Sequence, residues 1–197
     1  MKKILVLLLI IFVSGCTVVR IDTTSLDNIV GVVLSKENNL YNRIGKGYKY
    51  YIPRGVSYID TTEFNDKLYS NGYYYFMYID AVSYYNDIVL NYEENPNAFF
   101  SKSIDIDGEL GYLEINEFGS HYLVEYFFNY AKIETLVLER DIENVVIDSS
   151  YILSTVKFND NIIRLLLEDD YFTNREEVYD IFSAKGESSN FLRVEEE

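Results

Sequence analysis

The feature that most limits the fold is a series of short segments, mixing apolar and polar residues, that are separated by tight-turn sequences. Asp107-Gly108 is a dipeptide that favours two-residue turns between antiparallel strands, and Gly119 marks a second turn. The segments that read as strands are 98–107, 110–118, 121–130 and 132–138. This succession predicts an antiparallel meander.

Helical periodicity is found on both sides of this meander. Apolar residues spaced three and four apart, with capping residues at several starts, predict helices over 25–38, 61–69 and 141–157 and a further helix that opens at Thr173. Residues 48–52 predict a short strand. Residues 73–85 are apolar on both faces when read with a period of two, so we expect a central strand covered on both sides.

These elements predict one α+β domain over residues 25–183, with a largely antiparallel sheet packed by a few amphipathic helices. The last segment, residues 184–197, reads as an acidic C-terminal tail. A chain of 197 residues with 48% apolar side chains is large enough to bury a core.

Charge limits the partners of the chain. The formal net charge is −15, which removes the attraction that drives binding to phosphate backbones, so we expect no nucleic-acid partner. The charge is uneven, because residues 16–100 carry a net −3 and residues 101–197 a net −14. We expect the anionic half to lie away from an anionic membrane surface or to bind cations.

The N-terminus has the layout of a signal peptide. Lys2 and Lys3 precede an unbroken run of ten apolar residues, Ile4 to Val13, which is too short to span a bilayer. The run ends in Val13-Ser14-Gly15-Cys16, which contains the single cysteine of the chain.

These four residues resemble the lipobox of bacterial lipoproteins. The resemblance covers residues 1–16 only, and it implies that Cys16 receives a diacylglyceryl group after a signal peptide of residues 1–15 is removed. Residues 16–24 are then a tether, and the domain is held by lipid at the extracytoplasmic face of the cell membrane. The alternative is an ordinary signal peptide followed by a free Cys16.

Patterns for catalysis, metals and cofactors are weak. His121 adjoins Ser120, but neighbours on a strand point to opposite faces, so we expect no direct base and nucleophile pair. Residues 44–47 fail the phosphate-loop spacing, and residues 105–109 place glycine in the wrong register for a calcium loop. We therefore assign no catalytic residue, no metal site and no cofactor. The 32 acidic residues guarantee some carboxylate pairs, so counting them carries no signal.

One segment, residues 41–58, contains no acid in a strongly acidic chain. Its cations alternate with tyrosines and are Arg43, Lys46, Lys49 and Arg54. One interpretation is a contact with an anionic surface, such as lipid headgroups, wall polymer or an acidic partner. The other, which we weight somewhat more, is internal compensation of the acidic second half of the domain.

The sequence therefore predicts a membrane-anchored extracytoplasmic lipoprotein that acts as a binding or scaffold module of the bacterial cell envelope. Its partners are the membrane, through the lipid on Cys16, and an envelope protein or wall polymer. An enzyme is the less favoured class. The alternative function is a small-ligand, cation-binding or hydrolytic module with an acidic cleft.

Overall fold

The computed structural model describes residues 26–62 and 64–168. Several expectations therefore lie outside the described residues: the signal peptide, Cys16 and the tether, the helix that opens at Thr173 and the acidic tail.

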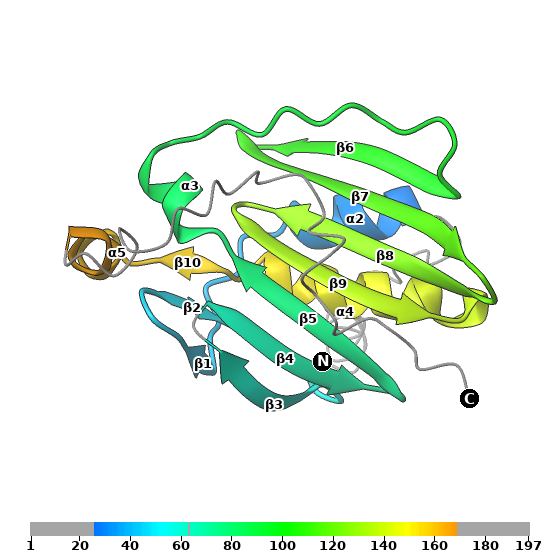
Figure 1. Cartoon of the computed structure of the whole chain (residues 1–197), viewed down its shortest axis with the longest axis horizontal. Helices are drawn as coiled ribbons and strands as arrows, with labels where there is room; N and C mark the ends of the chain where they lie inside the picture. The colour runs from blue at the N-terminus through cyan, green and yellow to red at the C-terminus, as the bar shows by residue number, and fades with distance from the viewer. Residues whose placement is uncertain (1–25, 63, 169–197) are drawn as a thin grey trace, which may run out of the picture.

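Seven antiparallel strands form the main sheet, in the spatial order β3-β4-β5-β9-β8-β7-β6 (Figure 1). Their bounds are β3 Ser57–Thr62, β4 Asn65–Ser70, β5 Tyr73–Ile79, β6 Phe100–Ile106, β7 Glu109–Phe118, β8 His121–Phe128 and β9 Ala131–Val137. A small antiparallel sheet has the order β1-β2-β10, with β1 Arg43–Ile44, β2 Tyr48–Tyr50 and β10 Lys157–Phe158. The predicted meander from β6 to β9 is confirmed.

The helices of the described residues are α2 Leu26–Leu34, α3 Ala81–Tyr85, α4 Ile142–Leu153 and α5 Asp160–Glu168, and a 3₁₀ turn, η1, spans Glu139–Asp141. The α+β class is confirmed. Of the helices within residues 26–168, none combines the length and the apolar character needed to cross a bilayer.

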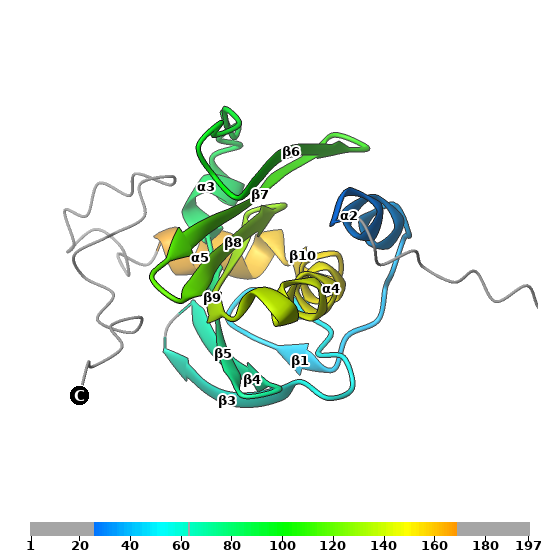
Figure 2. The ribbon, with the colours of Figure 1, turned by 90° about the vertical axis from the view of Figure 1, so that its right-hand side faces the viewer.

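The core lies between one face of the main sheet and α4. Figure 2 shows α2 and α4 on the same side of this sheet, with α2 packed against α4. The buried helix side chains include Ile29 and Val33 of α2 and Val146 and Ile152 of α4. Ile29 and Val33 lie four residues apart, and the buried Ser149 links Val146 to Ile152 in two steps of three. Spacings of three and four follow the helical period, which is why both helices could be predicted.

Two-residue turns fix the register of the main sheet. Asn71 and Gly72 between β4 and β5 have φ angles of 51° and 95°, and Asp107 and Gly108 between β6 and β7 have 55° and 86°. Positive φ at both central positions is the mark of the hairpin turns that match strand twist. Asn71-Gly72 thus closes a hairpin and does not end a helix.

The helix predicted over residues 61–69 is wrong. The segment forms the end of β3 and most of β4, where Asp66, Leu68 and Ser70 are buried in alternation. The four-residue spacing of Phe64 and Leu68, which suggested a helix, fits a strand equally well, because even spacings repeat with a period of two.

The central strand predicted over residues 73–85 is shorter and less covered than expected. β5 ends at Ile79, and the Asp80 carboxylate caps α3 by accepting a 2.9 Å hydrogen bond from the Ser83 amide. Tyr75 and Met77 face the core, whereas Tyr74 on the opposite face is 48% exposed. The described helices α2 and α4 cover only one face of the sheet.

The chain after residue 153 also departs from expectation. The helix predicted to reach residue 157 ends at Leu153, and Lys157 and Phe158 instead pair with β2. A further helix, α5, then begins at Asp160, three residues after the predicted end of that helix.

Both edges of the main sheet carry irregular features. The pairing of β3 with β4 shifts between Tyr58 and Asp60, which is a β-bulge. At the other edge, the Glu94 carboxylate accepts hydrogen bonds of 2.9 Å and 3.1 Å from the amide and hydroxyl of Ser103 in β6. These bonds lower the pKa of Glu94. Strand edges are therefore interrupted on both sides.

The two faces of β5 predict unequal tolerance to charge. Ile79→Asp should lower the free energy of unfolding by about 3 to 5 kcal/mol, because it places an unpaired carboxylate in the core. Tyr74→Asp, on the exposed face, is the matched control and should change stability much less. Urea unfolding monitored by circular dichroism measures both. Equal losses in the two variants would contradict the assignment of the faces.

Candidate functional site

The acid-free segment 41–58 folds mainly as the hairpin of β1 and β2, which we call the basic hairpin. Arg43 pairs with Tyr50 and Ile44 with Lys49 across the two strands. Residues directly opposite on antiparallel strands share a face, so Arg43 lies on the face of the buried Tyr50 and Lys49 on the face of the exposed Ile44. The structure therefore does not bring all four predicted cations onto one face.

Tyrosine rings take the place of carboxylates around two of these cations. The Arg43 guanidinium carbon lies 3.3 Å from the centroid of the Tyr58 ring, and Lys49 Nζ lies 4.2 Å from that of Tyr41. Both are cation–π contacts, which leave the positive charge in place. Lys46 and Arg54 are exposed in the turns that flank β2.

The ion pairs among the described residues use cations from other parts of the chain. They are Lys102–Asp27, Lys132–Glu134, Arg140–Asp141 and Lys157–Glu109. Within residues 26–62 and 64–168, Arg43, Lys49 and Arg54 form no ion pair with a carboxylate. Within the part of the chain that the structure describes, these three cations therefore have no carboxylate that compensates them by direct pairing.

A buried carboxylate lies beneath the inner face of the basic hairpin. Asp66 of β4 is 3% exposed, and its Oδ2 accepts hydrogen bonds of 3.1 Å from Tyr48 and 2.6 Å from Tyr50. The Thr61 hydroxyl donates to its Oδ1. Burial, together with Asp66, raises the pKa of both tyrosines, and Arg43 acts in the opposite direction. This network fastens the small sheet to the main sheet.

Three glutamates form a row on the other face of the main sheet. Glu125 of β8 pairs in register with Glu114 of β7 on one side and with Glu134 of β9 on the other. Like charges at directly opposed positions destabilise a sheet unless they are compensated. We call this set the glutamate row.

Each member of the glutamate row has a different environment. Burial raises the pKa of Glu125; Lys132 counteracts this, and Glu134 and Glu114 add to it. Lys132 Nζ lies 2.5 Å from Glu134 Oε1. Burial acts to raise the pKa of Glu114 as well, but hydrogen bonds from Asn116, Tyr92 and Asn95 leave it lowered. The row therefore contains one carboxyl without a hydrogen bond or ion pair among the described residues, Glu125.

Sequence reasoning missed the glutamate row. All three residues alternate with core residues of predicted strands, so each could have been placed on the polar face. Their alignment depends on strand register, however, which is set by the length of the connecting turns. The lengths of the turns at Gly119 and at Asn129-Tyr130 could not be predicted from the sequence.

Aromatic rings lie beside the glutamate row. The Tyr92 ring stacks on Tyr112 with a centroid distance of 4.2 Å, and Tyr112 stacks on Phe127 at 5.9 Å. Farther along the same face, Lys67 Nζ lies 4.2 Å from the centroid of the Tyr74 ring. This face thus mixes tyrosines with charges of both signs.

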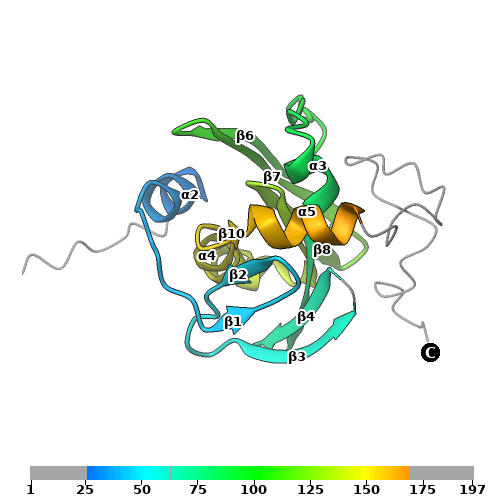
Figure 3. The ribbon, with the colours of Figure 1, turned by 90° about the vertical axis from the view of Figure 1, so that its left-hand side faces the viewer.

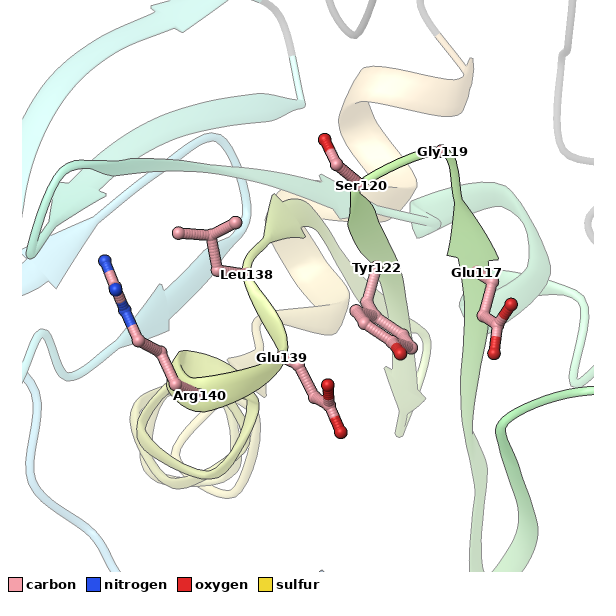
Figure 4. A pocket seen from close by; sticks show the side chains of 7 residues that line it. All are labelled: Glu117, Gly119, Ser120, Tyr122, Leu138, Glu139 and Arg140. Carbon is pink, nitrogen blue, oxygen red and sulfur yellow. The ribbon is translucent and has the colours of Figure 1, made fainter.

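Two cavities of the described residues were considered as ligand sites, and each is either small or open. The larger, about 460 Å³, is an open hollow where the β7–β8 turn meets η1. Figure 4 shows Glu117, Tyr122 and Glu139 directed to the same side, while Arg140 extends away from them. The second cavity, about 150 Å³, lies beside Phe127 and Tyr130. Glu125 lines neither cavity.

The expectation that Ser120 and His121 cannot pair is wrong. Ser120 lies in the turn before β8, where strand alternation does not apply, and its Oγ is 3.0 Å from His121 Nδ1. Ser120 is exposed, and no described carboxylate hydrogen-bonds to the imidazole. The contact therefore lacks the third group that orients the base in a catalytic triad. The part of the chain that the structure describes also contains no cluster of three or more acidic, histidine or cysteine side chains placed to hold a metal ion.

Comparisons with known proteins provide no relative to guide the assignment. The chain matches no protein-family model, no curated protein and no solved structure.

The network beneath the basic hairpin predicts a cost for losing one hydroxyl. Tyr50→Phe should lower the free energy of unfolding by about 1.5 to 3 kcal/mol, the usual contribution of a hydrogen bond to a charged group. Tyr41→Phe, at a half-exposed ring, is the control and should have little effect. Urea midpoints measure the difference. If Tyr50→Phe matches the control, Asp66 does not fasten the two sheets.

The raised pKa of Glu125 predicts a pH effect of known sign. A carboxyl with a raised pKa in the folded state contributes stability that is fully present below its unfolded pKa and is lost as pH rises through the folded pKa. Glu125→Gln should therefore melt above wild type near neutral pH and close to wild type near pH 4, an approximate bound set by the usual glutamate pKa. Glu93→Gln, at an exposed loop position, is the control and should leave the melting temperature unchanged at both pH values. Thermal melts of the variants and of wild type across this pH range measure the effect.

Proposed function

We propose that this protein is a bacterial lipoprotein whose extracytoplasmic domain serves as a binding or scaffold module of the cell envelope. The observation that carries the proposal is Val13-Ser14-Gly15-Cys16 at the end of a ten-residue apolar run. A diacylglyceryl group on Cys16 inserts two acyl chains, which anchor a protein far more firmly than one.

The position of the folded domain supports this proposal. The first described element, α2, begins at Leu26, so nine residues, or ten residue-to-residue steps, separate its start from Cys16. Fully extended, such a connection spans at most about 35 Å, which keeps the domain close to the bilayer. A protein held this way acts on what is present at the membrane surface.

The character of the described surfaces favours binding over catalysis. The larger cavity is an open hollow, and the second is small for a ligand site, since ligand pockets usually measure about 300 to 1,000 Å³ and bury most of the ligand. Exposed large apolar side chains are spread over the basic hairpin, α5 and the loop after α3, as Ile44, Leu165 and Val89 illustrate. Such a surface suits an extended partner.

One observation favours the alternative of a small-ligand, cation-binding or hydrolytic module. Glu125 is a largely buried carboxyl between two other glutamates, and perturbed carboxyls are common at functional sites. This alternative would gain support if Ca²⁺ raised the melting temperature of wild type and not that of Glu125→Gln.

Anchoring predicts a clear biochemical result. In a bacterium grown with a labelled fatty acid, the wild-type chain should carry label and fractionate with membranes, whereas Cys16→Ser should carry none and leave the membrane fraction. Ser14→Thr, a nearby change that keeps the cysteine, controls for general damage to the leader. Circular dichroism of the Cys16→Ser domain should be unchanged. An unlabelled wild-type protein would overturn the lipoprotein proposal.

A further inference from the structure

We propose that the outward side of the basic hairpin docks the domain onto the anionic bilayer that holds its lipid, and so sets its orientation. The inference rests on the proposed anchoring and adds a second, non-covalent contact. The residues that carry it are Tyr41, Ile44 and Lys49, with Arg54 in the turn that follows.

Apolar exposure is the first reason. Ile44 is 72% exposed and Tyr41 is 51% exposed, in a hairpin that also presents cations. Aliphatic and aromatic side chains beside basic ones are the composition of surfaces that lie in the headgroup region of a bilayer.

α5 extends this surface. The Asn159 amide donates a 2.8 Å hydrogen bond to the Gly47 carbonyl, which joins the start of α5 to the hairpin turn. A Cβ at Gly47 would lie 3.5 Å from Ile162 Cγ2, so Ile162 adjoins the turn. Ile162 and Leu165 are both exposed, and Figure 3 shows α5 next to the small sheet. Apolar groups thus continue from the hairpin onto the helix.

Charge complementarity is the second reason. The whole chain carries −15, yet the hairpin segment has no acid, and Lys49 and Arg54 form no ion pair among residues 26–62 and 64–168. Each Lys or Arg close to an anionic leaflet raises membrane partition about five-fold, the equivalent of ~1 kcal/mol. No carboxylate of the described residues therefore neutralises these two cations, which are suited to an external anion.

The geometry allows anchor and contact to act together. Figures 2 and 3 place α2 and β1 on the same side of the main sheet, and Cys16 precedes α2 in the chain. The glutamate row occupies the opposite face of that sheet, because Glu125 alternates with the core residues Val124 and Tyr126. Docking through the basic hairpin would turn the glutamate row away from the anionic lipid.

The experiment separates docking from lipidation. A hexahistidine tag replaces Cys16 on the mature chain and holds it on vesicles through a nickel-chelating lipid, so the result does not depend on acylation. Ile44→Cys then carries a polarity-sensitive dye, and the only native cysteine is absent. Phe118→Cys, at an exposed site near the β7–β8 turn, carries the same dye as a positional control.

The expected result is an apolar shift of the dye at residue 44 on vesicles of phosphatidylcholine with phosphatidylglycerol, and none on phosphatidylcholine alone. Added salt should reverse the shift. Lys49→Gln with Arg54→Gln should lower the docking constant about 25-fold, which is two cations at the five-fold value. Lys67→Gln with Arg140→Gln removes the same charge elsewhere and should leave docking nearly unchanged.

The docking proposal would be overturned by an unshifted dye at residue 44 on anionic vesicles, by an equal shift at residue 118, or by an equal loss of docking from the two double substitutions. An equal apolar shift of the dye in the presence of soluble polyphosphate would also contradict docking on a bilayer, because a polyanion offers no apolar interior. It would identify a polyanion as the ligand of this surface. If wild-type protein carried no label in the fatty-acid experiment, only the lipid-anchor proposal would be overturned. The docking proposal would still stand or fall by the tagged chain, which does not depend on acylation.

Discussion

The arrangement of the two sheets depends on one buried carboxylate, that of Asp66. A charge taken from water is costly unless hydrogen bonds replace the lost hydration, and here the hydroxyls of Tyr48, Tyr50 and Thr61 replace it. Two of those donors belong to β2, whereas Asp66 belongs to β4. The hydrogen bonds that replace the hydration of the carboxylate therefore also dock the small sheet on the main sheet. They help to position what the small sheet presents to the outside.

The main sheet separates two chemistries. One face packs against α4 with apolar residues such as Ile133 and Val124, both of which are fully buried. The opposite face carries the glutamate row, Lys67, Lys132 and tyrosines. Successive side chains of a strand point to opposite faces, so each strand contributes apolar residues to one face and polar residues to the other. The proposed membrane contact and the glutamate row consequently lie on opposite sides of the same seven strands.

Local patterns accounted for most of the fold and for little of the surface chemistry. The meander and α4 could be predicted because turn dipeptides and helical spacing are local signals. The segment around Asp66 could not, because a spacing of four between Phe64 and Leu68 fits both helix and strand, and the deciding contacts come from Tyr48 and Tyr50, far away in the chain. The glutamate row could not be predicted either, because it depends on the register between three different strands. The segregation of Arg43 from Lys49 follows from strand pairing, which composition does not reveal.

Under the proposed anchoring, which would confine the protein to a membrane surface, the irregular strand edges have a consequence. Molecules on one membrane surface meet one another in two dimensions. There, a regular unpaired strand edge could pair with the edge strand of a neighbour, and repeated pairing would build a continuous lateral array. The bulge near Tyr58 and the Glu94 carboxylate on Ser103 interrupt that template on both flanks. Copies crowded on one membrane would then remain separate molecules, free to diffuse and to meet a different partner.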